Sequence, residues 1–108
     1  MTGQFPHPSL TPQQAEALTL LAEEASEVAI ECSKILRSGT DFCRRGRDVP
    51  NSTHLVIETV DFLVLLAIVE ELGLLDSNQN PDALARAKAE KLAQWSNLGD
   101  VAKEVVGD

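Results

Sequence analysis

Apolar residues recur at helical spacing between residues 11 and 37, which predicts a long amphipathic helix. Thr11 followed by Pro12 and Gln14 is a capping-box start with proline in the first turn. Gly39 follows as a stop signal, so the helix is expected to end at about residue 37. The apolar stripe of this helix consists of Leu18, Leu21, Ala22, Ala25, Val28, Ala29, Cys32, Ile35 and Leu36.

A second helical pattern begins near Asn51 or Ser52 and ends at about Leu72, where Gly73 and a turn-rich segment follow. It is apolar on almost every side, through Leu55, Val56, Ile57, Val60, Phe62, Leu63, Val64, Leu65, Leu66, Ala67, Ile68, Val69 and Leu72. A helix with this pattern is normally buried by other helices.

A third helix is predicted from Pro81 to about Trp95, with Asn80 as its cap and Asp82 in the first turn. Residues 99 to 106 are expected to form at most a marginal short helix, because glycines flank them. The chain shows no strand pattern and no internal repeat. These patterns predict an all-α fold.

The expected architecture is a helical bundle of two long antiparallel helices plus a third. We divide the chain into a flexible leader (1–10), a helical domain (11–98) and a C-terminal tail (99–108). Two other helices cannot cover a second helix that is apolar all round, so oligomerisation should complete the core. The sequence therefore predicts a homodimer or homotetramer.

Composition narrows the function classes. The 108 residues, 44% of them hydrophobic, suffice for one core. A net charge of −8 argues against binding to nucleic acid or to an anionic membrane surface, because such proteins need a basic footprint. An acidic protein can still bind a small phosphate compound through a metal ion.

The cysteines and the apolar runs indicate the cellular compartment of the protein. Cys32 and Cys43 lack CxxC spacing, and no signal-peptide pattern precedes them, which favours free thiols in a reducing cytoplasm. The longest apolar run, residues 60 to 69, is interrupted by Asp61 and is too short to cross a bilayer. We therefore expect a cytoplasmic protein that is not embedded in a membrane.

Two acidic pairs share i, i+3 spacing: Glu24 with Glu27, and Glu58 with Asp61. The second pair lies in the apolar helix, where an unpartnered carboxylate is strongly destabilising unless a cation compensates it. Carboxylate oxygens contributed by two helices suit Mg²⁺, or Mn²⁺, better than softer metals. No Glu-x-x-His pattern accompanies them, so a di-iron centre is not expected.

Two other interpretations of the acids stay open at this point. The stripe of Glu24, Glu27, Glu31 and Lys34 can be a solvated helix face. Glu58 and Asp61 can instead be neutralised by arginines of the polar connection between the helices.

Basic and aromatic residues are candidates for substrate contacts. Guanidinium and ammonium groups bind phosphate oxygens, although basic loops and helix surfaces are often merely solvated. The phosphate-binding candidates are Lys34, Arg37, Arg44, Arg45, Lys88 and Lys91, with Arg47 in the same basic loop. Phe42 and Trp95 are candidates for stacking on a base, whereas Phe62 is expected in the core.

The order of these motifs resembles the all-α nucleoside triphosphate pyrophosphohydrolases, the MazG-like superfamily that includes the dimeric dUTPases. Their signature, Glu-Glu-x-x-Glu followed by Glu-x-x-Asp, is matched by Glu23-Glu24-x-x-Glu27 and Glu58-x-x-Asp61. The likeness extends over residues 10 to 98 and includes Ser33-Lys34-Ile35-Leu36-Arg37 and Lys88-x-x-Lys91-Leu92 leading to Trp95. Two departures are a long connection between the acid pairs and the lack of an aromatic beside the first pair.

The resemblance implies Mg²⁺ held by Glu24, Glu27, Glu58 and Asp61, and hydrolysis of a nucleoside triphosphate to monophosphate and pyrophosphate. Glu24 or Glu27 is expected to accept the proton of the attacking water, with Glu23 and Glu31 supporting the ligands. The alternative is a non-catalytic helical module that binds a nucleotide or a protein. A general helical adaptor is a third possibility.

Overall fold

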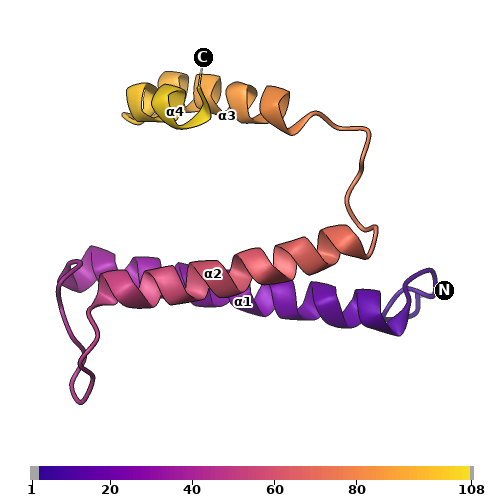
Figure 1. Ribbon diagram of the computed structural model, residues 1–108, viewed down its shortest axis with the longest axis horizontal. Coiled ribbons are helices and arrows are strands. Elements are labelled where there is room, and N and C mark those ends of the chain that lie inside the picture. The colour runs from indigo at the N-terminus through magenta and orange to yellow at the C-terminus, as the bar shows by residue number, and fades with distance from the viewer. Residues whose placement is uncertain (1–2, 108) are drawn as a thin grey trace. The chain divides into compact units, whose positions relative to one another are not determined.

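The computed structural model describes residues 3 to 107, which form four helices and no strand (Figure 1). The helices are α1 (Pro12–Ser38), α2 (Asn51–Glu71), α3 (Pro81–Trp95) and α4 (Gly99–Val106). This confirms the predicted all-α class. The chain divides into two compact units between Leu75 and Asp76, within the predicted 11–98 domain, and each unit is described by itself.

The ends of α1 follow the predicted chemistry. The Thr11 hydroxyl accepts a hydrogen bond from the Gln14 backbone N–H at 3.1 Å, and the Gln14 side chain accepts one from the Thr11 N–H at 2.9 Å. At the other end Gly39 has φ of 86°, a conformation that favours glycine, and its N–H donates to the Ile35 carbonyl at 2.8 Å. The helix extends one residue beyond the predicted end.

The hairpin formed by α1 and α2 is fastened near both ends by side-chain amides. Gln14 Nε2 donates to the Leu72 carbonyl at 2.9 Å, and Asn51 Nδ2 donates to the Gly39 carbonyl at 3.1 Å. Asn51 is 1% exposed, and no side-chain cap begins α2. Asn51 therefore begins the helix as predicted, but its side chain joins the two helices instead of capping one.

Within one chain, α2 contacts α1 along one side only. Of its residues only Asn51 and Val69 are buried. Its exposed apolar side chains, between 41% and 60% accessible, are Val56, Ile57, Val60, Leu63, Val64 and Ile68. A single neighbouring helix covers only one side of an apolar helix, so α1 leaves most of the apolar surface of α2 uncovered within the hairpin.

The length argument against a membrane span does not hold for α2 as a whole. Among the described residues it is the one helix long and apolar enough to cross a bilayer, with a mean hydropathy of 1.8 over its best window. The apolar run from residue 60 to 69 is shorter than α2, so its length underestimates the apolar length of this helix. Length and composition are weak evidence, since core helices of soluble proteins meet the same test, and carboxylates inside a bilayer are costly.

In the second unit, α3 begins and ends where the sequence predicts, and Asn80 Oδ1 accepts a hydrogen bond from the Ala83 N–H at 3.2 Å. The short helix α4 also forms, with Gly99 as its first residue. A Cβ atom at Gly99 would lie 2.8 Å from the Ala93 Cα atom. The glycine that weakened the prediction of α4 is therefore what allows its close approach to α3.

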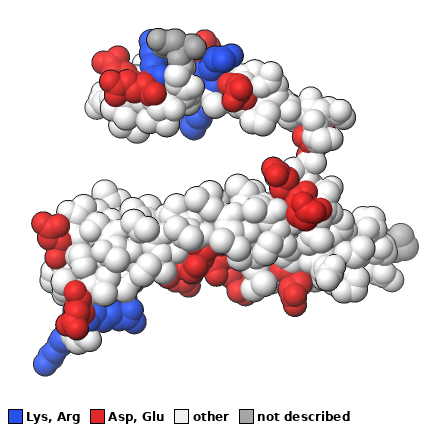
Figure 2. Space-filling model, viewed as in Figure 1, with Lys and Arg blue, Asp and Glu red and all other residues white. Residues whose placement is uncertain are grey.

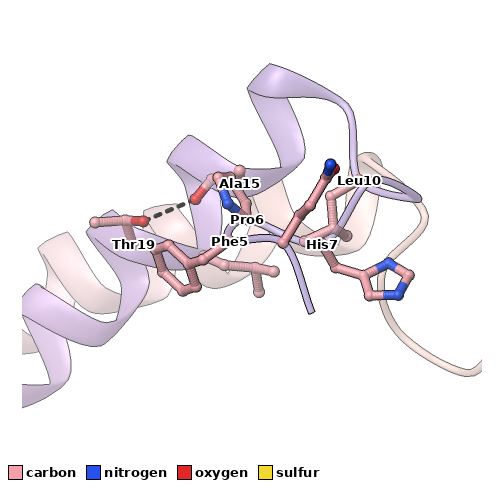
Figure 3. Close-up of a pocket in the computed structure, with 8 residues that line it drawn as sticks. Phe5, Pro6, His7, Leu10, Ala15 and Thr19 are labelled. Carbon is pink, nitrogen blue, oxygen red and sulfur yellow. Dashed lines mark hydrogen bonds between the residues drawn. The ribbon is translucent and has the colours of Figure 1, made fainter. Parts of the chain in front are cut away.

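The leader, described from residue 3, folds into a turn ahead of α1. The Leu10 N–H donates to the His7 carbonyl at 3.0 Å, and the imidazole of His7 shares a hydrogen bond with the Ser9 hydroxyl at 2.8 Å. Phe5 and Pro6 lie beside the first turns of α1, around a cavity of about 320 Å³ (Figure 3). Residues 1, 2 and 108, parts of the predicted leader and tail, are outside the described residues.

Candidate metal centre

Three of the four predicted metal ligands come together near the middle of the hairpin. Glu24 of α1 and Glu58 and Asp61 of α2 each place a carboxylate oxygen within 4.8 Å of the other two. Glu24 and Glu58 are half-buried, and Asp61 is exposed. The i, i+3 spacing on α2 puts its two acids on the same side of that helix, where α1 supplies the third.

The fourth predicted ligand, Glu27, lies one helical turn beyond Glu24 and is exposed. Its carboxylate is outside the group of three. It is nevertheless close enough that its charge contributes to raising the pKa of Glu24. Glu27 therefore lies beside the group of three carboxylates but is not one of its members.

Negative charge at the centre is not neutralised by the chain itself. Partial burial, followed by the charges of Asp61, Glu58, Glu27 and Glu23, raises the pKa of Glu24 above its usual value. Among residues 3–107 the single ion pair joins Lys34 to Glu31, so no arginine of the same chain pairs with Glu58 or Asp61. A bound divalent cation would relieve this repulsion.

Replacing Glu24 with Gln should stabilise the metal-free protein at neutral pH. A carboxyl group whose folded-state pKa is raised stabilises the fold below its unfolded-state pKa and loses this contribution as the pH rises through the folded-state value. The melting temperature of Glu24→Gln should therefore match wild type near pH 4 and exceed it at pH 7.

Saturating Mg²⁺ should reverse the order of the two melting temperatures, because wild type gains more binding energy from the metal. Glu16→Gln, an exposed change on the same helix, is the control. A Glu24→Gln variant less stable than wild type at pH 7 without metal would contradict this account.

Glu31, predicted to support the ligands, is instead part of a buried ion pair. It is 5% exposed, and its Oε2 atom accepts a hydrogen bond from Lys34 Nζ at 2.8 Å. Its other oxygen, Oε1, has no hydrogen-bond partner. Lys34, predicted to bind phosphate, is thus directed to Glu31.

The arginines predicted to bind phosphate are not near the carboxylates of their own chain. Arg37 lies in the last turn of α1, and Arg44 and Arg45 are exposed in the connection that follows. In Figure 2 the Lys and Arg side chains of the hairpin gather at its loop end, whereas carboxylates are spread along its length. The structure does not bring these two predicted groups together.

Other predicted contacts lie elsewhere. Phe42 is half-exposed in the same connection. Lys88, Lys91 and Trp95 belong to the second unit, whose place relative to the hairpin is not determined.

The leader supplies the aromatic side chain that α1 lacks. Phe5 lines a groove of about 470 Å³ along α1, together with Leu18, Thr19, Ala22, Glu23 and Ser26. Glu23, predicted to support the ligands, therefore lines this groove in addition to adding its charge near Glu24. The sequence offered no signal for the place of Phe5, because a residue outside the helix has no periodic position.

No family model, curated protein or solved structure matches this chain. The resemblance to the all-α nucleoside triphosphate pyrophosphohydrolases therefore stays a prediction from the order and spacing of the sequence motifs.

Proposed function

We propose that this protein is a Mg²⁺-dependent nucleoside triphosphate pyrophosphohydrolase. The observation that carries the proposal is the convergence of Glu24, Glu58 and Asp61 within 4.8 Å from two helices, with no ion pair to any of the three among residues 3–107. Three oxygen donors of this kind suit Mg²⁺ or Mn²⁺ and leave coordination positions for phosphate oxygens and water. When bound, the metal supplies charge neutralisation and an activated water.

The position of each residue indicates its role in the proposed reaction. Glu24, Glu58 and Asp61 hold the metal, and Glu27 at the border accepts the proton of the water that attacks the α-phosphorus. The new bond joins this oxygen to the α-phosphorus, and the bond between the α-phosphorus and the bridging oxygen breaks. The products are a nucleoside monophosphate and pyrophosphate.

The test is a product analysis with each common ribonucleoside and deoxyribonucleoside triphosphate, with Mg²⁺ and with EDTA. Turnover in ¹⁸O-labelled water should place the label in the monophosphate, because the α-phosphorus is attacked. Orthophosphate release, or label in pyrophosphate, would contradict the proposal. Mg²⁺-dependent binding without any product would instead favour the non-catalytic nucleotide-binding module.

We further propose that a second copy of the chain covers the exposed apolar side of α2, giving a homodimer or homotetramer. The support is the set of half-exposed Val, Ile and Leu side chains of α2, which α1 leaves uncovered within the hairpin. An obligate interface of this kind resembles a domain core that has been divided between two chains.

Replacing Val60 with Glu should dissociate this assembly. Val60 is 51% exposed in the single chain, where a charge would have little effect, but a covered position would bury that charge. We expect sedimentation equilibrium to show a lower mass and thermal unfolding to show a lower melting temperature. Gln94→Glu, an exposed change on α3, should alter neither. An unchanged mass for Val60→Glu would place the interface elsewhere.

A further inference from the structure

The hairpin by itself supplies no free cation to the metal centre for binding a triphosphate. Carboxylates of Glu23, Glu24, Glu27, Glu58 and Asp61 surround it, and a triphosphate adds several more negative charges. Sites that transfer phosphoryl groups offset such charge with arginine or lysine as well as metal. Along the hairpin the nearest lysine is Lys34, and its ammonium is already paired with Glu31.

The arginines of the hairpin lie at or beyond the far ends of the helices from the carboxylates. About 14 residues of α1 separate Glu24 from Ser38, and about 7 residues of α2 separate Asn51 from Glu58, the nearer of the two acids on α2. At a rise of 1.5 Å per residue, these correspond to roughly 21 Å and 10 Å. Arg44, Arg45 and Arg47 lie farther away still, because the connection continues beyond these helix ends.

The connection between the helices, residues 39 to 50, is an ordered ribbon that we call the arginine finger. The Asn51 N–H donates to the Phe42 carbonyl at 2.9 Å, and Cys43 and Pro50 form an antiparallel bridge. At its tip the Arg47 N–H donates to the Arg44 carbonyl at 2.8 Å. The ribbon leads away from the helix axes (Figure 1), so its tip does not fold back toward the metal centre.

The arginine finger carries three arginines, none of them ion-paired within residues 3–107, together with Asp41 and Asp48. Arg44, Arg45 and Arg47 are exposed, and none forms an ion pair within the described residues. Gly46, with φ of 80°, closes the turn that holds them together. Guanidinium groups on a fixed turn are well suited to bidentate binding of phosphate oxygens.

We propose that the arginine finger of one copy reaches the metal centre of a second copy and binds the β- and γ-phosphates there. This inference rests on the proposed function, and it names the residues that complete the site. A second copy is already proposed to cover α2, and the arginines of the finger are opposite in charge to the carboxylates of the metal centre. In a two-fold dimer the exchange is reciprocal, so each dimer contains two complete centres.

Complementation between two inactive variants tests this arrangement. Glu58→Gln keeps the finger and loses a metal ligand, whereas the triple variant Arg44→Ala/Arg45→Ala/Arg47→Ala keeps the ligands and loses the finger. When the two chains are co-expressed, about half of the dimers are mixed, and each mixed dimer has one intact centre out of two. Activity should then recover to about a quarter of wild type, although each variant alone is inactive.

A binding measurement provides a readout that does not depend on turnover. Titration calorimetry with inorganic pyrophosphate in excess Mg²⁺ should detect about a quarter of the wild-type sites in the mixture, with wild-type affinity, and weak binding in each variant alone. The matched control is Arg86→Ala/Lys103→Ala, which removes exposed charge from the second unit and should bind pyrophosphate as wild type does. Because the finger arginines are exposed, the triple variant should keep the wild-type melting temperature.

Two outcomes overturn the inference: wild-type pyrophosphate binding by the triple arginine variant, or no recovery in the mixed sample. A wild-type protein that hydrolyses no nucleotide would refute the proposed function instead. The pyrophosphate titration of the mixture would still decide whether the finger acts on a second copy.

Discussion

Replacing Glu58 with Gln, or Asp61 with Asn, is expected to lower kcat/KM for the hydrolysed nucleotide by at least about 100-fold, the scale expected when one electrostatic contact of a transition state is lost. Each change preserves side-chain shape but removes one charge from the three-carboxylate group. The measurement is steady-state kinetics at saturating Mg²⁺, on the substrate identified by the product analysis.

The same two variants should be at least as stable as wild type when metal is absent. Each relieves repulsion among Glu24, Glu58 and Asp61, whose mutual charge raises the pKa of Glu24. The increase of melting temperature that Mg²⁺ produces in wild type should be strongly reduced in both variants. A loss of activity without a loss of metal-free stability would indicate a functional site. If the carboxylates had a structural role, replacing them would lower both activity and stability.

Glu70→Gln is the matched control, since Glu70 is an exposed carboxylate on the same helix outside the group. It should retain both activity and the Mg²⁺ effect on melting temperature. Wild-type kinetics in Glu58→Gln or Asp61→Asn would remove the metal centre from the reaction.

The second large effect concerns stability: Lys34→Met should lower the free energy of unfolding by about 3–5 kcal/mol. The side chains of Lys34 and Glu31 are 17% and 6% exposed, so the change leaves a buried carboxylate without its partner. Since Oε1 of Glu31 already lacks a hydrogen bond, both of its oxygens would then be unsatisfied.

The double variant Glu31→Met/Lys34→Met should recover most of this loss, because it removes the stranded charge and puts apolar side chains in its place. Both are measured by urea unfolding at one fixed protein concentration, since assembly contributes to apparent stability. Lys103→Met, an exposed change on α4, should stay within about 0.5 kcal/mol of wild type. A double variant as unstable as Lys34→Met would show that the pair itself, and not the stranded carboxylate, matters.

Local chemistry explains why the helix boundaries were predictable. Capping by Thr11 and Gln14, the stop at Gly39 and the cap at Asn80 each depend on residues within four positions of one another. The i, i+3 spacing of Glu58 and Asp61 is equally local, and it placed two ligands of the candidate site on one side of α2.

What required the structure involves residues that are distant in the chain. Glu27 and Glu31 have the same spacing signals as Glu24, yet Glu24 joins the carboxylates of α2, Glu27 remains outside the group, and Glu31 is buried in the hairpin. The rotation and register of α1 against α2 decide this, and the amide bonds of Gln14 and Asn51 contribute to that register. Periodicity states which residues share a face, not which residue of the neighbouring helix it meets.

The sequence by itself determined an all-α chain, the bounds of its helices and the pairing of acids on α2, because each follows from contacts within a few turns. Only the tertiary structure decided that Glu24 completes a group of three, that Glu31 is buried, and that the arginine finger leads away from the helix axes. These outcomes depend on how far each helix extends and how the two pack. The order of charged residues along the sequence does not show how two helices pack against each other.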